Sequence, residues 1–138
     1  MNTRTFAMIF GIVFLLVGAL GFVPNMVHGP MAGHELSMKQ GYGDLLGLFP
    51  VNMLHNIVHL LFGVWGVLAA RSLTGSRMYF RAVAVIYALL TVMGLVPMLN
   101  TTFGLIPIYG NDVWLHALLA IVAAYFGWMH RDLAADRP

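Results

Sequence analysis

Two histidines and two asparagines lie within eight residues inside an otherwise apolar segment. Residues 52–59 read Asn-Met-Leu-His-Asn-Ile-Val-His, so Asn52, His55, Asn56 and His59 would share one side of a helix. Imidazole can ligate a metal, and a side-chain amide can both donate and accept hydrogen bonds. Polar groups at membrane depth are costly and usually face a partner or a cavity. The segment therefore predicts an internal polar site.

A second pair of ionisable residues, Asp112 and His116, is again spaced by four. Pairs at i and i+4 on two helices bring their side chains toward one point, and imidazole with carboxylate suits zinc, copper, iron or nickel. We interpret His55, His59, Asp112 and His116 as candidate metal ligands. At about 1.5 Å per residue, His55 and His116 lie at a similar depth, His59 about one turn deeper and Asp112 at the rim. All four share one ion only if a helix is tilted or the predicted boundaries shift by two residues.

Two other roles are open for the same residues. His55 and His116 could be axial ligands of a haem or chlorophyll held between helices. Alternatively, the polar groups hydrogen-bond to one another and to backbone carbonyls and so determine helix register. Asn52 and Asn56 are the candidates for such a structural network.

The loop before the second apolar segment is rich in methionine and histidine. Thioether and imidazole together favour copper, although methionine is also an ordinary packing residue. The candidates in this loop are Met26, His28, Met31, His34 and Met38.

The composition is that of a membrane protein. The chain has 138 residues, of which 60% are hydrophobic and 9% charged, and its mean hydropathy is +0.84. A soluble domain carries about 25% charged residues, and about 20 apolar residues suffice to cross a bilayer. We expect a single all-α domain, an integral membrane four-helix bundle with spans at about 5–27, 50–70, 78–99 and 112–129. Cysteine is absent, which excludes thiolate chemistry.

Each predicted span carries a stripe of small or polar residues that should face its neighbours. Pro50 would begin the second span, and Asp112 would cap the fourth. The stripes are Gly11, Gly18, Gly21 and Asn25; Asn52, His55, Asn56, His59, Gly63, Gly66 and Ala70; Ala84, Tyr87, Thr91 and Gly94; and Asp112, His116, Ala120, Ala123 and Gly127.

The basic residues predict the orientation. Lys39 lies on one side of the predicted bundle, and the arginines lie on the other: Arg4, Arg71, Arg77, Arg81, Arg131 and Arg137. By the positive-inside rule both termini are cytoplasmic, in a multi-pass protein of the bacterial inner (plasma) membrane. The positive charge is thus a topology signal, and we expect no nucleic-acid partner.

No catalytic motif is present. The sequence lacks a Gly-x-Ser-x-Gly elbow, a Walker loop, a dinucleotide-binding fingerprint and His-Glu-x-x-His. We expect a non-enzymatic protein in contact with the lipid bilayer and with other membrane subunits or further copies of itself. It would be an accessory or scaffold subunit of a larger complex. The alternatives are a zinc- or copper-binding membrane module, or a protein that binds a tetrapyrrole through His55 and His116.

Two stretches resemble a known family. They are residues 48–66, with Leu-Phe-Pro-Val-Asn, His-Asn-Ile-Val-His-Leu and Gly-Val-Trp-Gly, and residues 104–116, with Gly-Leu-Ile-Pro and Gly-Asn-Asp-Val-Trp-Leu-His. Both are similar to a bacterial family of small four-span membrane proteins catalogued as domain of unknown function 4383. The resemblance implies a four-helix membrane fold and brings no established reaction, substrate or cofactor.

Overall fold

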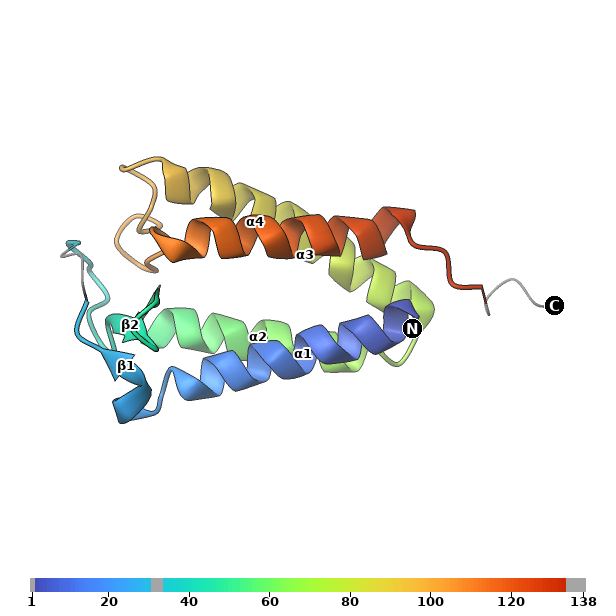
Figure 1. Cartoon of the computed structure of the whole chain (residues 1–138), viewed down its shortest axis with the longest axis horizontal. Coiled ribbons are helices and arrows are strands. Elements are labelled where there is room, and N and C mark those ends of the chain that lie inside the picture. Colours follow the sequence, from blue (N-terminus) through green and yellow to red (C-terminus); the bar gives the residue numbers. More distant parts are fainter. Residues whose placement is uncertain (1, 31–33, 134–138) are drawn as a thin grey trace.

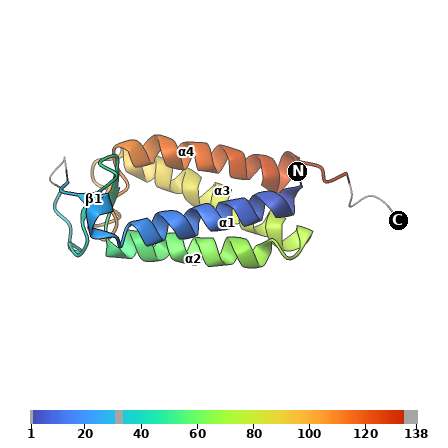
Figure 2. The same ribbon diagram turned by 60° about the horizontal axis from the view of Figure 1, so that its bottom comes forward.

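The chain forms a bundle of four helices with a small sheet at one end. The computed structural model describes residues 2–30 and 34–133. Within them, the helices are α1 (Thr3–Leu20), α2 (Met53–Ala69), α3 (Leu73–Leu95) and α4 (Asn111–Ala124), and α4 continues as a π-helical turn, Tyr125–Met129. The start of α1 and the end of the π-helical turn lie at one end of the bundle and the strands at the other, and α1 runs beside α2 (Figures 1 and 2).

Three of these helical segments are long and apolar enough to cross a membrane: Thr3–Leu20, Leu73–Leu95 and Asn111–Met129. The fourth, Met53–Ala69, is apolar but shorter. The fold is thus mostly helical, as the sequence predicts, with four helices in the predicted order.

The helix boundaries differ from the predicted ones because local capping decides them. α1 ends at Leu20 rather than at residue 27, since Pro24 follows and begins a short 3₁₀ turn, Pro24–Met26. The prediction that Pro50 begins the second helix is wrong, because Pro50 lies in a strand and Asn52 caps α2. α3 begins five residues before the predicted residue 78, because the side chain of Ser72 caps it by accepting a hydrogen bond from the Gly75 amide.

The sequence does not predict the sheet, so the all-α class needs correction. Strands β1 (Val27–His28), β2 (Gly43–Leu45) and β3 (Phe49–Val51) pair antiparallel in the order β1-β2-β3. Val27 lies opposite Leu45, which in turn lies opposite Phe49. Strands of two or three residues are too short to show an alternating pattern. The sheet closes the end of the bundle where α2 begins (Figure 1).

Glycines bring α1 and α2 into close contact. A Cβ atom added to Gly11 would lie 2.6 Å from the Val67 amide nitrogen and 2.8 Å from the Gly63 carbonyl oxygen. One added to Gly66 would lie 2.8 Å from the Gly11 Cα atom. Such backbone-to-backbone approach is what small residues permit in membrane helix pairs.

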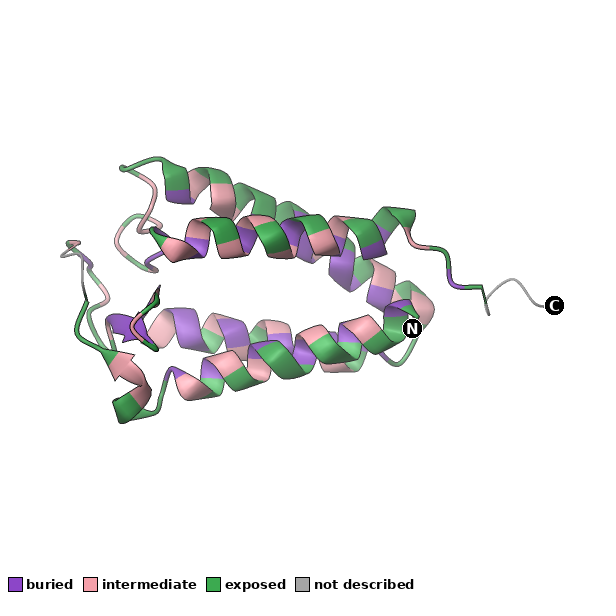
Figure 3. Ribbon diagram, viewed as in Figure 1, coloured by how far each residue is buried: buried purple, intermediate pink, exposed green. Residues whose placement is uncertain are grey.

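The outer surface of the bundle is apolar, unlike that of a water-soluble domain, and the interior holds a hydrophobic core that includes Phe14, Phe80 and Val83. The predicted inward stripes of α2 and α4 are buried, whereas large apolar side chains point outward, among them Leu61 (64% exposed), Val85 (63%) and Ile121 (69%). Figure 3 shows buried residues facing the bundle interior and exposed ones along its outside. Asn25 was expected to face inward, and this expectation is wrong, because Asn25 lies beyond the end of α1 and is exposed.

Candidate metal centre

Asn52 determines where α2 begins and so which way its first turn faces. Its side-chain oxygen accepts a hydrogen bond from the His55 amide at 2.9 Å. Its side-chain nitrogen donates to the carbonyl of Met38 at 3.0 Å and to that of Leu105 at 2.7 Å. The residue is fully buried. One amide therefore caps α2 and ties it to two loops, which orients His55 toward the bundle interior.

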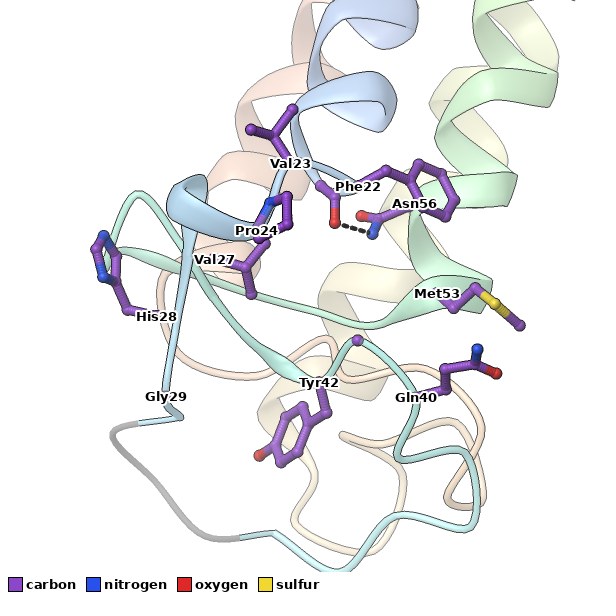
Figure 4. A pocket seen from close by; sticks show the side chains of 12 residues that line it. Phe22, Val23, Pro24, Val27, His28, Gly29, Gln40, Tyr42, Met53 and Asn56 are labelled. Atoms are coloured by element: carbon purple, nitrogen blue, oxygen red, sulfur yellow. Dashed lines mark hydrogen bonds between the residues drawn. The ribbon is translucent and has the colours of Figure 1, made fainter.

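Asn56 ties α2 to the end of α1. Its side-chain nitrogen donates to the Gly21 carbonyl at 2.8 Å, a hydrogen bond that Figure 4 marks with a dashed line. Gly21 has no room for a Cβ atom, because the Asn56 side chain occupies that space. Both asparagines thus make the backbone hydrogen bonds that a structural network requires.

Three other residues form a compact group that we call the His–Asp cluster: His55, Asp112 and His116. Each offers one ligating atom, and these atoms all lie within 4.8 Å of one another. The side chains are almost completely buried, with residue exposures of 4%, 3% and 2%. His55 comes from the first turn of α2, and the other two come from α4, so the cluster joins the two helix pairs of the bundle.

The contacts inside the His–Asp cluster are too long for hydrogen bonds. The His55 Nε2 atom lies 3.9 Å from the Asp112 Oδ2 atom, whereas an N–H···O bond spans about 2.7–3.2 Å. Among the described residues, neither Asp112 Oδ2 nor His116 Nδ1 has a hydrogen-bond partner. Buried polar atoms are normally satisfied, and a ligand between them would satisfy these atoms.

The ring of His55 is held as a metal-binding imidazole is held. Its Nδ1 atom lies 3.2 Å from the Pro50 carbonyl oxygen. A carbonyl only accepts, so Nδ1 carries the hydrogen, and in the neutral ring Nε2 keeps its lone pair facing Asp112. Metal-bound histidines almost always donate their second N–H to a carbonyl or carboxylate in this way.

His59 lies beside the His–Asp cluster but is not part of it. Its ring centroid is 4.5 Å from that of His55, and its other neighbour is Phe14, whose ring is stacked at 5.8 Å. His59 is one turn further along α2 than His55. The structure therefore brings three of the four candidate ligands together.

The prediction that Asp112 caps the fourth helix is wrong. Gly110 occupies the cap position with φ +64°, and no side chain caps this helix. α4 begins at Asn111, so Asp112 lies within its first turn and points inward. This two-residue shift of the cap, from Asp112 to Gly110, turns Asp112 into a member of the His–Asp cluster.

The residues proposed from the first loop do not gather around that cluster. His28 lies on β1 and is exposed, and the ring of His34 stacks on Tyr109 at 3.8 Å. Met26 and Met38 are partly buried, and Met31 lies outside the described residues. Within the described ranges, neither His28 nor His34 belongs to a group of three ligating histidine or acidic residues.

An open cavity of about 440 Å³ lies near this loop, lined by residues that include Asn56, Tyr42 and Met53. The ring of His28 points away from the other side chains that line it (Figure 4). The Tyr42 and Tyr109 hydroxyls are hydrogen-bonded to each other, and burial together with this bond raises the pKa of Tyr109. These tyrosines therefore join loops and do not form a second ligand cluster.

Sequence reasoning did not identify the role of Asp132. Its carboxylate accepts hydrogen bonds from the backbone nitrogen and the hydroxyl of Thr3, at 2.7 and 2.6 Å. Burial by itself would raise the pKa of Asp132, but the bonds from Thr3, with His130 and Arg77 nearby, hold it below its ordinary value. Thr3 and Asp132 are 129 positions apart, so no local pattern could have indicated this contact.

The fold and the cluster define a class: a mostly helical bundle of apolar helices that encloses a histidine- and aspartate-containing polar centre. The chain belongs to the family described as Domain of unknown function (DUF4383), which matches residues 4–129. This match confirms the family resemblance of the sequence. No curated protein and no solved structure matches the chain.

Proposed function

We propose that this protein is an integral membrane module that binds a divalent transition metal, zinc in the first instance, at the His–Asp cluster. The proposal is for binding, without an enzymatic step. The main support for the proposal is that three ligating atoms of buried residues on two helices lie within 4.8 Å of one another. Two of the three residues also present an atom without a hydrogen-bond partner in the described part of the chain.

Membrane placement is supported by the outward apolar surface and by the three long apolar segments. Arg4 lies in the first turn of α1, Arg71 lies between α2 and α3, and Arg131 follows the last helical turn. All three regions lie at the end of the bundle where α1 starts, opposite the strands (Figure 1). Lys39 belongs to the loop at the opposite end. We therefore propose cytoplasmic termini in a bacterial inner membrane, by the positive-inside rule.

The donor set is one that zinc sites use. Catalytic-type zinc sites use three nitrogen or oxygen ligands and leave a fourth position open. Two zinc ligands at about 2.1 Å in tetrahedral arrangement are about 3.4 Å apart. The 3.9 Å between His55 Nε2 and Asp112 Oδ2 must therefore shrink by about 0.5 Å. The wider separations in the cluster, up to 4.8 Å, must shrink by up to about 1.4 Å, through side-chain rotation on binding.

The tetrapyrrole alternative is supported less well. A macrocycle would have to lie between the rings of His55 and His116, whose centroids are 6.3 Å apart. The Asp112 carboxylate presents its ligating atom to the same space. That arrangement suits a single ion better than a flat macrocycle.

A role as accessory or scaffold subunit is the second candidate, and the two asparagines favour it. Asn52 and Asn56 make hydrogen bonds to backbone carbonyls outside α2, as internal structural groups do. This role needs no ligand at the His–Asp cluster. A fixed partner captured with the detergent-purified protein would support it.

The deciding experiment is element-resolved mass spectrometry of protein purified in detergent from metal-replete cells. We expect about one zinc ion per chain, lost in His55→Ala and retained in His28→Ala. The latter removes an exposed imidazole that lies outside the cluster. Metal-free wild-type protein, or a His55→Ala variant that keeps its metal, would refute the proposal, whereas copper or iron in the same stoichiometry would change only the ion.

A further inference from the structure

An apolar groove separates α1 from α4. It has a volume of about 260 Å³ and is lined by one side of α1, by residues of β2 and β3, and by the outer half of α4. We call it the α1–α4 groove. Its walls are almost entirely hydrocarbon and include three aromatic rings, those of Phe10, Phe14 and Phe49. Its rim on α1 includes Ile9 and Val13, which are 39% and 49% exposed. In a bilayer this rim faces lipid.

Three polar residues interrupt the apolar lining: His59, Asp112 and His116. All are at least nine-tenths buried. Each has one side-chain atom without a hydrogen-bond partner in the described part of the chain, namely His59 Nδ1, Asp112 Oδ2 and His116 Nδ1. An unsatisfied buried donor or acceptor is destabilising unless something bonds to it. Three such atoms on residues that line one groove point to a ligand with a polar head.

We infer that the α1–α4 groove binds a membrane-soluble phenol or quinol, a flat hydroxylated ring with an apolar tail. A hydroxyl donates to the carboxylate and accepts from an imidazole N–H, so one small head can satisfy both kinds of group. The aromatic walls suit a flat ring, which packs edge-to-face or offset against phenylalanine. The tail continues along the rim into the acyl chains.

Other amphiphiles fit the groove less well. A carboxylate head would approach Asp112 with like charge in a medium of low dielectric constant, where repulsion is strong. An ammonium head donates hydrogen bonds but accepts none, and so cannot satisfy an imidazole N–H. A plain alcohol satisfies the polar groups but leaves the aromatic walls without a ring partner.

The inference depends on the membrane placement proposed above and does not require the metal. The groove and the His–Asp cluster share Asp112 and His116, so a bound metal and the phenol head would compete for these two residues. His55 belongs to the His–Asp cluster and does not line the groove, whereas His59 lines the groove and is outside that cluster. The two sites can therefore be tested separately with His55→Ala and His59→Leu. Metal-free protein that still binds the phenol would end the metal proposal and leave this one intact.

The experiment uses four probes that share a decyl tail: 4-decylphenol, decanol, decanoate and decylammonium. The protein is placed in phosphatidylcholine nanodiscs with Trp65 and Trp128 changed to phenylalanine. The remaining tryptophan, Trp114, reports binding, because its ring lies 5.9 Å from that of Phe49 in the groove wall. We expect a saturable emission change with 4-decylphenol, after subtraction of empty nanodiscs, at least tenfold tighter than with the other probes. A decyl-substituted benzoquinol in the same assay distinguishes a quinol from a simple phenol as the preferred source of the ring.

Variants locate the binding. His59→Leu should weaken 4-decylphenol at least tenfold and leave metal content unchanged. Val17→Phe fills the groove and should abolish binding. Leu16→Phe adds the same ring at the preceding position of α1, where the side chain is exposed and lies outside the groove. It should leave the binding of 4-decylphenol unchanged. Equal binding of decanol, tighter binding of either charged probe, or normal phenol binding in His59→Leu or Val17→Phe would each overturn the inference.

Discussion

Replacing Gly11 with alanine should destabilise the bundle, although alanine is the better helix former. The new Cβ atom would lie 2.6 Å from the Val67 amide nitrogen, 2.8 Å from the Gly63 carbonyl oxygen and 2.9 Å from Val67 Cγ2. Two of these three neighbours are backbone atoms, which cannot rotate away. α1 and α2 must therefore separate locally by about half an ångström or more.

The magnitude follows from two opposing effects. Inserting a methyl group into a well-packed interior destabilises by about 1–3 kcal/mol. The gain in helix propensity from glycine to alanine is about 1 kcal/mol, although it was measured in water. Because all three contacts of the added Cβ atom are shorter than 3.0 Å, the packing effect lies at the upper end of its range, about 2–3 kcal/mol. We therefore expect Gly11→Ala to lower the free energy of unfolding by about 1–2 kcal/mol.

Reversible unfolding in mixed detergent micelles measures this free energy directly. Gly29→Ala is the control, because a Cβ atom there meets nothing within 4 Å, and its stability should equal that of the wild type. Adding Val67→Ala to Gly11→Ala should restore only part of the loss, since it removes Cγ2 and leaves the amide nitrogen in place. A Gly11→Ala protein as stable as the wild type, or more stable, would refute the close backbone contact between α1 and α2.

Three further predictions concern capping and ligand binding. The hydrogen bonds from Thr3 hold the pKa of Asp132 below its ordinary value of 3.8. The Asp132 carboxylate therefore contributes its full stabilisation above pH 3.8. This stabilisation is lost as the pH falls through the lower pKa that Asp132 has in the folded protein. Thermal unfolding of Asp132→Asn should show a smaller loss of Tm below pH 4 than the wild type, and equal losses would contradict the contact. Asn52→Ala should lose about 2–4 kcal/mol in chemical unfolding, because it removes the cap of α2 and two part-buried hydrogen bonds to the Met38 and Leu105 carbonyls. Asn52→Ser keeps a side-chain oxygen for the cap and removes only those two bonds, so it should lose less. An unchanged Asn52→Ala would argue against this role. Zinc at about 100 times its Kd should add about 2.7 kcal/mol to the stability of the wild type in a thermal-shift assay and nothing to His55→Ala, and a shift of equal size in both would place zinc elsewhere.

The inward faces of α2 and α4 could be predicted from the sequence because helical periodicity is a local property. Residues three and four apart lie on one side of any helix, so His55, His59 and Gly63 were bound to share a face wherever α2 packs. The same holds for Asp112, His116 and Ala120 on α4. The buried stripes of both helices are therefore confirmed, while Asn25, extrapolated beyond the end of a helix, faces out.

Capping and strand formation were harder to predict. Pro50 was expected to begin a helix and lies instead in β3, and Asp112 was expected to be a cap and lies within the first turn of α4. In both places the alternatives differ by only one to three residues. Long-range contacts then decide between them, such as the pairing of Gly43 with Val51 and the bonds from Asn52 to Met38 and Leu105.

The sequence by itself determined the number and order of the helices, their apolar outward faces and the level of each polar group along its own helix. Composition and period suffice for these properties, since each depends on residues close together in the chain. The tertiary structure decided which polar groups meet. How closely two helices approach, and at what rotation, depends on contacts such as Gly11 with Gly63, and no local pattern encodes them. That geometry brings Asp112 to His55 and His116, places His59 in the lining of the α1–α4 groove, and places Asp132 at the start of α1.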